Sequence, residues 1–281
     1  MMVRGIRFDF SKPCIMGILN ITPDSFSDGG SFDSTEKAVM HAVYMAENGA
    51  DIIDMGAEST RPGAAAVTEQ EELSRLIPVI SAFRELNKNT PVSADTYKAK
   101  TAAEAIKAGA DMINDISGGT FDSAMMQTAG KLDVPYVIMH TKNTPDKMQK
   151  DTAYSDKGAV SDILEYFRER IAAAIKAGIK KDNIILDPGI GFGKTQQDNI
   201  EIIKNTVEFK KLGFPVLIGA SRKSFIGNIT GKPPDKRIFG SAAAAAVSVI
   251  FGADILRVHD VPEMRDCVKT AYEFIKTKKE G

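Results

Sequence analysis

The stretch "NGADIIDMG" at residues 48–56 decides the fold, because it joins the end of a helical pattern to the start of a strand-like run. The same phrase returns as "AGADMIND" at residues 108–115 and as "FGADILRV" at residues 251–258. In each copy a glycine suited to ending a helix precedes Ala-Asp and an apolar run of strand length. The phrase therefore predicts a chain that passes repeatedly from helix to strand.

Apolar runs of strand length recur along the whole chain, and stretches with helical spacing separate them. "TEKAVMHAVYMAENGA" and "KAKTAAEAIKAGA" are amphipathic examples that predict helices between strands. Eight strands are predicted, at residues 14–20, 51–56, 91–96, 111–117, 135–140, 183–189, 215–221 and 254–260.

Near-continuous apolar strands that alternate with helices indicate a parallel sheet covered by helices. Eight such units in 281 residues fit a (β/α)8 barrel, with the segment before residue 14 left over as a hairpin at the barrel floor. A doubly wound open sheet is the alternative. No linker or change of composition marks a second domain, so residues 1–281 are predicted to form one domain.

The composition excludes several classes of partner and location. Thirty-six basic and thirty-seven acidic residues give a net charge of -1, which offers no general attraction to nucleic acid or to an anionic membrane. Cys14 and Cys267 lie far apart in apolar elements, which predicts reduced thiols in a cytoplasmic protein. No run approaches the roughly 20 apolar residues that span a bilayer, and the first residues lack the apolar block of a signal peptide.

Polar side chains stand at or just after the carboxyl end of every predicted strand, where barrels of this kind carry their chemistry. Burying such groups without partners costs several kcal/mol, so eight polar ends together favour one site. These residues are Asn20, Glu58, Ser59, Thr60, Arg61, Asp95, Asn114, Asp115, His140, Asp187, Arg222, Lys223, Ser224, Arg257, His259 and Asp260.

Six ordered segments resemble the signature segments of the dihydropteroate synthase family. They are "GILNITPDSFSDGG", "GAESTRPGA", "INDISGG", "LDPGIGFGK", "SRKSF" and "RVHD", and they span nearly the whole chain. The resemblance implies a transferase on a (β/α)8 barrel that joins 6-hydroxymethyl-7,8-dihydropterin diphosphate to 4-aminobenzoate and releases pyrophosphate with Mg²⁺ present. The product, 7,8-dihydropteroate, is a folate precursor, and sulfonamides compete for the aminobenzoate site.

The resemblance also implies a role for particular residues. The pterin would bind Asp95, Asn114, Ile116, Met139, Asp187, Phe192 and Lys223. The diphosphate would bind Asn20, Thr60, Arg61, Arg257 and His259, with Asn20 also helping to hold Mg²⁺. The aminobenzoate would lie against Phe26, Thr60, Pro62 and Ser224.

Chemical reasoning supports parts of this assignment. The carboxylate of Asp187 can accept two hydrogen bonds from a heterocyclic amine and its neighbouring ring nitrogen. Arg257 and His259 stand two apart on one predicted strand, so their side chains point the same way. Free backbone N–H groups at the helix start near Ser224 favour an anion.

No strong base stands beside the weakly nucleophilic arylamine, so a dissociative order is predicted. Diphosphate leaves first with help from Mg²⁺, Arg257 and His259, and Asp95 and Asp187 stabilise the pterin methylene cation before the amine attacks. The predicted catalytic residues are Asp95, Asp187, Lys223, Arg257 and His259.

Three alternatives remain open at this stage: a pterin-binding methyltransferase that acts with a corrinoid protein, a catalytically silent pterin-binding paralogue, and a zinc hydrolase. The chain has three histidines and neither a His-x-His nor a His-Glu-x-x-His motif, which disfavours zinc. The helix "GSAAAAAVSVIFG" at residues 240–252 is apolar on every face. Because members of the resembled family are commonly dimers, a homodimer is predicted.

Overall fold

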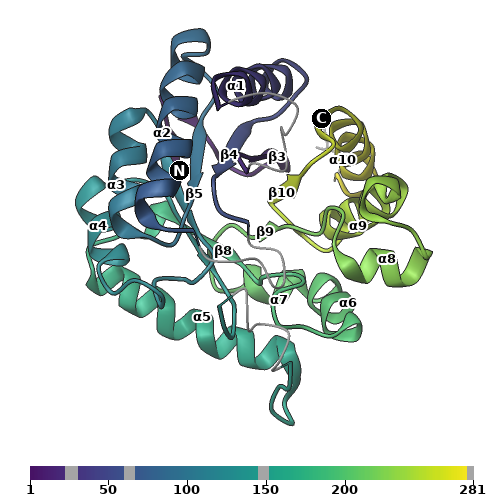
Figure 1. Ribbon diagram of the computed structural model, residues 1–281. Coiled ribbons are helices and arrows are strands. Elements are labelled where there is room, and N and C mark those ends of the chain that lie inside the picture. The colour runs from purple at the N-terminus through teal and green to yellow at the C-terminus, as the bar shows by residue number, and fades with distance from the viewer. Residues whose placement is uncertain (23–30, 60–66, 145–151, 277–281) are drawn as a thin grey trace, which may run out of the picture.

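Eight parallel strands form one sheet in a computed structural model that describes residues 1–22, 31–59, 67–144 and 152–276. The strand order is β8-β7-β6-β5-β4-β3-β10-β9, and a parallel bridge between Leu186 and Val216 joins its two ends. Helices surround this ring of strands (Figure 1). The predicted (β/α)8 barrel is confirmed.

The strands follow the predicted order and are mostly shorter than predicted. They are β3 (Cys14–Asn20), β4 (Ile52–Gly56), β5 (Val92–Asp95), β6 (Met112–Asp115), β7 (Tyr136–Met139), β8 (Ile184–Asp187), β9 (Leu217–Ile218) and β10 (Ile255–Val258). The helices are α1 (Ser31–Glu47), α2 (Glu69–Leu86), α3 (Ala99–Ala108), α4 (Met125–Leu132), α5 (Gly158–Lys176), α6 (Gln196–Lys204), α7 (Thr206–Lys210), α8 (Ser224–Thr230), α9 (Ile238–Ile250) and α10 (Val261–Ile275).

The largest departure is β9, which was predicted to extend from residue 215 to residue 221. The chain leaves the ladder after Ile218 and makes a turn, in which the Lys223 N–H donates to the carbonyl of Ala220 at 3.3 Å. Arg222 adopts a positive φ of 58° within this turn. The run contains Gly219 and Ser221, which favour turns, and the ladder ends directly before Gly219.

A small antiparallel hairpin precedes the barrel, as predicted. Its strands are β1 (Met2–Val3) and β2 (Ile6–Arg7), and the turn between them places Arg4 and Gly5 at positive φ. Val3 and Phe8 are buried in one apolar cluster with residues at the bottom of the barrel interior. The hairpin therefore covers the barrel floor.

The barrel interior changes from apolar to polar within one layer of side chains. The bottom layer is apolar and consists of Met16, Ile52, Met112, Val137, Ile185, Leu217 and Ile255. Because side chains alternate along a strand, the residue two positions after each of these faces the interior again. In β4, β6, β8 and β10 those residues are Asp54, Asn114, Asp187 and Arg257.

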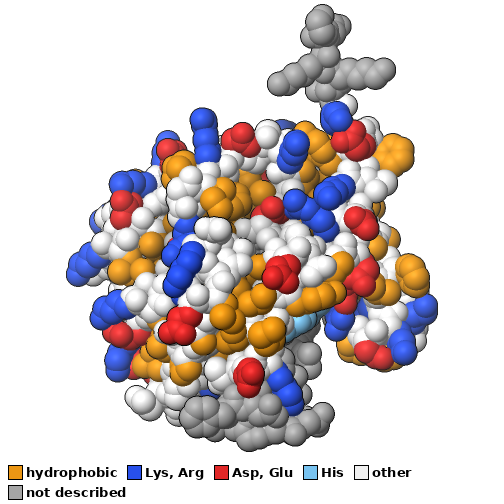
Figure 2. Space-filling view, turned by 90° about the horizontal axis from the view of Figure 1, so that it is seen from above, with side chains coloured by type: hydrophobic (Ala, Val, Ile, Leu, Met, Phe, Trp, Pro, Cys, Tyr) orange, Lys and Arg blue, Asp and Glu red, His pale blue; other side chains and the backbone are white. Residues whose placement is uncertain are grey.

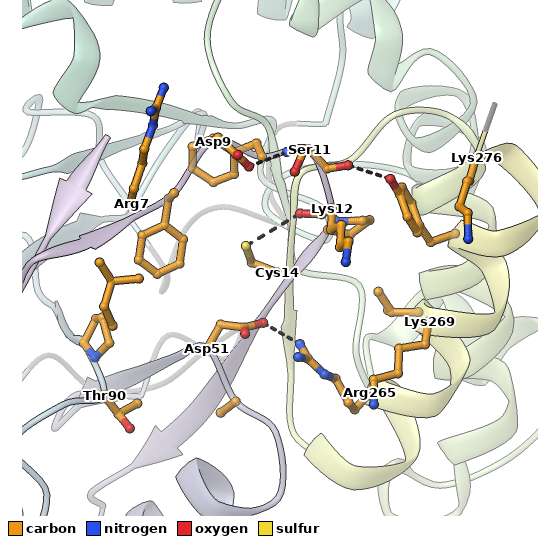
Figure 3. Close-up of a pocket in the computed structure, with 18 of the residues that line it drawn as sticks. Arg7, Asp9, Ser11, Lys12, Cys14, Asp51, Thr90, Arg265, Lys269 and Lys276 are labelled. Atoms are coloured by element: carbon orange, nitrogen blue, oxygen red, sulfur yellow. Dashed lines mark hydrogen bonds and ion pairs between the residues drawn. The ribbon is translucent and has the colours of Figure 1, made fainter. Parts of the chain in front are cut away.

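A groove of about 1320 Å³ lies at the opposite, amino end of the strands (Figure 3). It separates the segment after the hairpin from α10, and two contacts join its walls. The Arg265 guanidinium donates to Asp51 at 2.6 Å, and the Tyr272 hydroxyl donates to the carbonyl of Ser11 at 2.8 Å. Because chemistry in this fold lies at the carboxyl ends, the groove is not the expected catalytic site.

The outer surface has charges of both signs, in keeping with the small net charge. Figure 2 shows basic and acidic side chains interspersed with apolar ones on the face that carries α1 and α2. Among the helices of the described ranges, none is both long enough and apolar enough to cross a membrane.

Gly189, which follows β8, is expected to tolerate a side chain less well than Gly213. Both have positive φ, at 70° and 87°, so an alanine at either position costs about 1–2 kcal/mol of unfolding free energy. At Gly189 an added Cβ would also lie 2.0 Å from the carbonyl oxygen of His140, whereas at Gly213 it would meet nothing within 4 Å. Urea denaturation should therefore show a larger loss for Gly189→Ala than for Gly213→Ala, and equal losses would contradict the described packing.

Candidate active site

One guanidinium links two buried carboxylates across the upper layer of the barrel. Arg257 on β10 donates from Nε to Oδ2 of Asp54 at 2.6 Å and from Nη2 to Oδ2 of Asp95 at 2.6 Å. The same Asp54 oxygen accepts a hydrogen bond from Nδ2 of Asn114 at 3.0 Å. Four strands, β4, β5, β6 and β10, therefore contribute to one hydrogen-bonded group.

Asp187 and Lys223 add two more charged groups from β8 and from the start of α8. The Asp187 carboxylate accepts the Gly189 N–H at 2.7 Å, and the Lys223 ammonium donates to the carbonyl of Ile190 at 2.8 Å. Gly191 allows this approach, because a Cβ there would lie 3.0 Å from Cδ of Lys223. We refer to Asp54, Asp95, Asn114, Asp187, Lys223 and Arg257 as the carboxyl-end cluster.

Apolar side chains gather beside these charges. Ile116, Met139 and Phe192 form a separate buried cluster, against which Tyr97 and Phe121 pack. The Lys223 ammonium lies 4.1 Å from the centre of the Phe192 ring, which is a favourable cation–π distance. The site therefore combines apolar surface with hydrogen-bonding groups, as the binding of a flat polar heterocycle requires.

Burial shifts the pKa values of three groups in the cluster, Asp95, Asp187 and Lys223, toward neutral pH. It raises the pKa of Asp95 to about 7, opposed by the attraction of Arg257 and reinforced by the charge of Asp54. It also raises the pKa of Asp187, against the Gly189 hydrogen bond and the charge of Lys223. Burial and repulsion from Arg257 lower the pKa of Lys223 to about 8. Such perturbed groups in one place are typical of functional sites.

The pKa of Arg257 shifts away from neutral pH, in contrast to those of Asp95, Asp187 and Lys223. Burial disfavours the charged guanidinium, but the carboxylates of Asp54 and Asp95 outweigh that effect and raise the pKa of Arg257 above its ordinary value. Arg257 is therefore a permanent cation inside the barrel, and Asp95, with a pKa of about 7, carries a charge that varies near neutral pH.

His259 follows β10 and hydrogen-bonds to Ser221, with Nδ1 at 3.0 Å from the hydroxyl oxygen. Burial, together with repulsion from Arg257 and Arg222, lowers the pKa of His259 to about 3. The imidazole is thus neutral near pH 7 before any anion binds, so it can offer a hydrogen bond but no positive charge. The guanidinium of Arg222 forms a bidentate ion pair with Asp260.

A buried lysine of the "LDPGIGFGK" segment holds the loop after β8 in place. Nζ of Lys194 lies 3.0 Å from Nδ1 of His140 and donates to the carbonyl of Phe192 at 2.9 Å. The ring of His140 meets the ring of Tyr166 edge to face at 4.9 Å. His140 is therefore a structural residue, and within the described ranges no group of three or more His, Cys, Asp or Glu could hold a metal.

The predicted site residues are distributed as follows. Asp95, Asn114 and Arg257 belong to one hydrogen-bonded group, while Asp187 and Lys223 interact with it through charge. Asn20 is the last residue of β3 and pairs in register with Gly56 on β4. A Cβ atom added at Gly56 would lie 3.2 Å from the Cβ of Asp95. Ser224 is the first residue of α8. Phe26, Thr60, Arg61 and Pro62 lie outside the described residues.

Sequence reasoning gave no role to Asp54 or Lys194. Asp54 stands in the middle of a strand, and only residues near strand ends were considered, although its position two residues after Ile52 places it in the barrel interior. Lys194 is the last residue of the "LDPGIGFGK" segment, and a lysine in a glycine-rich loop gives no sign in the sequence that it is buried. Glu58, by contrast, supports the surroundings of the site, since it accepts a hydrogen bond from the Tyr97 hydroxyl at 2.8 Å and pairs with Lys98 at 2.5 Å.

Comparisons with known proteins agree on one family. The family model described as pterin binding enzyme matches residues 16–259. A dihydropteroate synthase from Bacillus subtilis is 48% identical over 259 residues, covering 92% of this chain and 87% of the relative. The crystal structure of Yersinia pestis dihydropteroate synthase in a sulfonamide drug complex superposes with a TM-score of 0.92, 40% identity and 99% coverage of both chains. Xanthomonas albilineans dihydropteroate synthase with 4-aminobenzoic acid gives 0.89 and 41%, with 97% coverage of both.

Lys194 is expected to make stability depend on pH. Burial and repulsion from Lys223 lower its pKa from 10.5 to about 7, against the attraction of Asp187. Between these two values the unfolded chain holds a proton that the folded chain has released, so the free energy of unfolding should rise with pH across the window. In Lys194→Met this contribution is absent. The difference in unfolding free energy between wild type and Lys194→Met should therefore change by on the order of a few kcal/mol across this pH window.

Urea denaturation at several pH values measures this contribution. Lys180→Met, which removes an exposed amine, is the matched control for the substitution itself. Parallel stability curves for wild type and Lys194→Met would show that the buried amine does not titrate as described.

Proposed function

Because the chain belongs to the dihydropteroate synthase family of pterin-binding enzymes, we propose that its carboxyl-end cluster binds the pterin ring of the diphosphate substrate. The enzymes of this family are transferases that make 7,8-dihydropteroate. One observation carries the assignment of the site: Oδ1 of Asn114 is buried without a partner in the described residues, within the carboxyl-end cluster. A buried acceptor of this kind is expected to receive a ligand donor.

The hydrogen-bonding edge of a pterin has amine and ring N–H donors beside a carbonyl acceptor. Asp187 is suited to accept from the amine and the neighbouring ring nitrogen, and Asn114 and Asp95 offer further acceptors. Lys223 would donate to the ring carbonyl. Ile116, Met139 and Phe192 provide the apolar surface on which a flat ring can lie. Together these groups match the donors and acceptors of the ring.

The diphosphate would bind toward β10 and β3, where Arg257 supplies charge, His259 a hydrogen bond and Asn20 an amide oxygen. Mg²⁺ fits this arrangement, because the ion prefers oxygen ligands and usually keeps several waters together with substrate phosphates. A single protein oxygen from Asn20 would suffice to hold it there. When bound, Mg²⁺ would neutralise charge that develops on the leaving diphosphate. Thr60 and Arg61, outside the described residues, complete the proposed set.

The aminobenzoate would lie at the outer end of the site, toward the start of α8 at Ser224. Phe26, Thr60 and Pro62 are proposed as its other neighbours. Support comes from the similar Xanthomonas albilineans enzyme, which is described with 4-aminobenzoic acid, and from the Yersinia pestis enzyme with a sulfonamide. We therefore propose that sulfonamides compete with aminobenzoate in this protein too.

The charge pattern supports a dissociative order of steps. No strong base is assigned to the arylamine, whereas two buried carboxyl groups, Asp95 and Asp187, belong to the proposed pterin site. Arg257 and His259 would stabilise the departing diphosphate, and Asp95 and Asp187 would stabilise the cation until the amine attacks. The carbon–oxygen bond to diphosphate breaks before the carbon–nitrogen bond forms, and the amine proton leaves last.

The outer face of α9 supports the proposed homodimer. Ser241, Ala245 and Val249 pack inward, while Phe239 is 80% exposed and Ile250 is 50% exposed. Apolar side chains on an outer helix face are suited to contact a second copy.

The free cysteines support the proposed cytoplasmic location, for which cell fractionation is the direct check.

Purified protein mixed with the pterin diphosphate, Mg²⁺ and labelled 4-aminobenzoate is expected to form dihydropteroate. Asp187→Ala and Lys223→Ala should each lose on the order of a hundredfold or more of kcat/KM, because each removes a preorganised contact to the ring. Lys232→Ala, an exposed change beyond α8, is the control and should retain activity. Full activity in both site variants would remove the proposed pterin contacts.

The order of steps is tested with enzyme in excess over pterin diphosphate. The dissociative route predicts pyrophosphate release in the absence of 4-aminobenzoate. A release that depends strictly on added aminobenzoate would contradict it.

The dimer proposal makes a separate prediction. Ile250→Glu places a charge in the outer face of α9 and should convert a dimer to a monomer in light scattering. Val207→Glu, at a 44% exposed position on α7, is the matched control and should leave the dimer intact. A wild-type protein that is monomeric at high concentration would contradict the proposal.

A further inference from the structure

We propose that Asp54 positions two groups of the site at once: it orients the amide of Asn114 toward the pterin, and it holds Arg257 beside Asp95. The inference deepens the proposed function and rests on it. Asp54 has no exposed surface and acts through the two side chains that it binds, so it is a positioning residue.

Asp54 lies where a carboxylate is costly. It is the third residue of β4, it is completely buried, and it stands directly above the apolar bottom layer, which includes Ile52. Its neighbour in register on β5 is Ser93, which has no hydrogen-bond partner in the described residues. A buried carboxylate in such surroundings is sustained by the groups that it binds, which are Arg257 and Asn114.

The contact with Asn114 fixes which end of the amide faces Asp54. A carboxylate only accepts hydrogen bonds, so the NH2 end must point toward it, as the 3.0 Å contact between Nδ2 of Asn114 and Oδ2 of Asp54 indicates. The oxygen of Asn114 then points elsewhere, and it is one of the buried side-chain atoms that lack a hydrogen-bond partner in the described part of the chain, as is Oδ1 of Asp54. Asp54 thereby presents a fixed acceptor to the ring.

The contact with Arg257 places the cation. Oδ2 of Asp54 accepts from Nε and Oδ2 of Asp95 accepts from Nη2, so the guanidinium is held from two sides. The remaining N–H groups of the fork can serve an anion. Because two carboxylates share this one cation, Asp54 also weakens the positive field that a diphosphate would meet.

These two contacts predict different changes in pterin affinity and pyrophosphate affinity when Asp54 loses its charge. In Asp54→Asn the amide oxygen still has to accept from Arg257 Nε, and as a neutral acceptor it binds the NH2 group of Asn114 less strongly than the carboxylate does, so the Asn114 oxygen is held less firmly toward the ring. Arg257 would meanwhile be less neutralised. Pterin binding should weaken, while pyrophosphate binding should not.

The experiment compares wild type and Asp54→Asn by calorimetry with two separate probes, a pterin without a diphosphate group and inorganic pyrophosphate with Mg²⁺. The variant is expected to bind pterin about tenfold more weakly, because a neutral hydrogen bond replaces a charge-assisted one, and to bind pyrophosphate at least as tightly. Ser93→Ala changes a buried polar residue in the same layer and should leave both affinities unchanged.

Each outcome decides something. A wild-type protein that binds no pterin would reject the proposed function itself. If wild type binds pterin and Asp54→Asn binds it equally well, the positioning role is overturned. A folded variant that loses both ligands would show that Asp54 only supports the barrel, which also overturns the proposal.

A second variant serves if Asp54→Asn does not fold. Asn114→Asp places two carboxylates at a distance of 3.0 Å, where they must share a proton to avoid repulsion. Pterin binding should then be weak at alkaline pH and recover at acid pH, and wild-type affinity at alkaline pH would overturn the proposal. Wild type is measured at each pH as the reference, because other charged groups face the pair. They are Asp95, Asp187, Lys223 and Arg257.

Discussion

The site depends on one buried cation held between two buried carboxylates. The guanidinium of Arg257 reaches Asp54 and Asp95 at 2.6 Å each, and through Asp54 it is connected to Asn114. Without the cation, two carboxylates and an amide would face each other in the barrel interior at a large desolvation cost. With it, three strands and β10 share one rigid, charged surface, to which Asp187 adds from the end of β8 and Lys223 from the start of α8.

This group of charges lies directly above an apolar layer of the barrel interior. Met16, Ile52 and their neighbours fill the interior below, and the hairpin covers the floor. The polar layer above holds the buried charges of the site, and burial brings the pKa of Asp95 to about 7 and that of Lys223 to about 8. The same burial that destabilises these charges gives the site acceptors and donors whose charge responds near neutral pH.

Much of this arrangement could be predicted from the sequence. The "GAD" phrases and apolar runs gave eight strands in the correct order, because hydrophobic periodicity reports burial directly. The early end of β9 was missed although Gly219 and Ser221 favour a turn there. The conformation of Arg222 within that turn depends on tertiary contacts, with Ser241 of α9 and with Asp260 just before α10. Asp54 was missed although strand alternation from Ile52 places it in the interior. The neutral state of His259 also needed the structure, because it follows from burial and from neighbouring cations.

The most direct test of the account is the proton balance of pterin binding. Calorimetry in buffers with different ionisation enthalpies measures how many protons the protein exchanges when the ring binds. If Asp95, with a pKa of about 7, becomes a charged acceptor for the ring, binding near pH 7 should release protons, and Asp95→Asn should abolish the release. Binding without proton exchange, or an unchanged release in Asp95→Asn, would contradict the central role assigned to the carboxyl-end cluster.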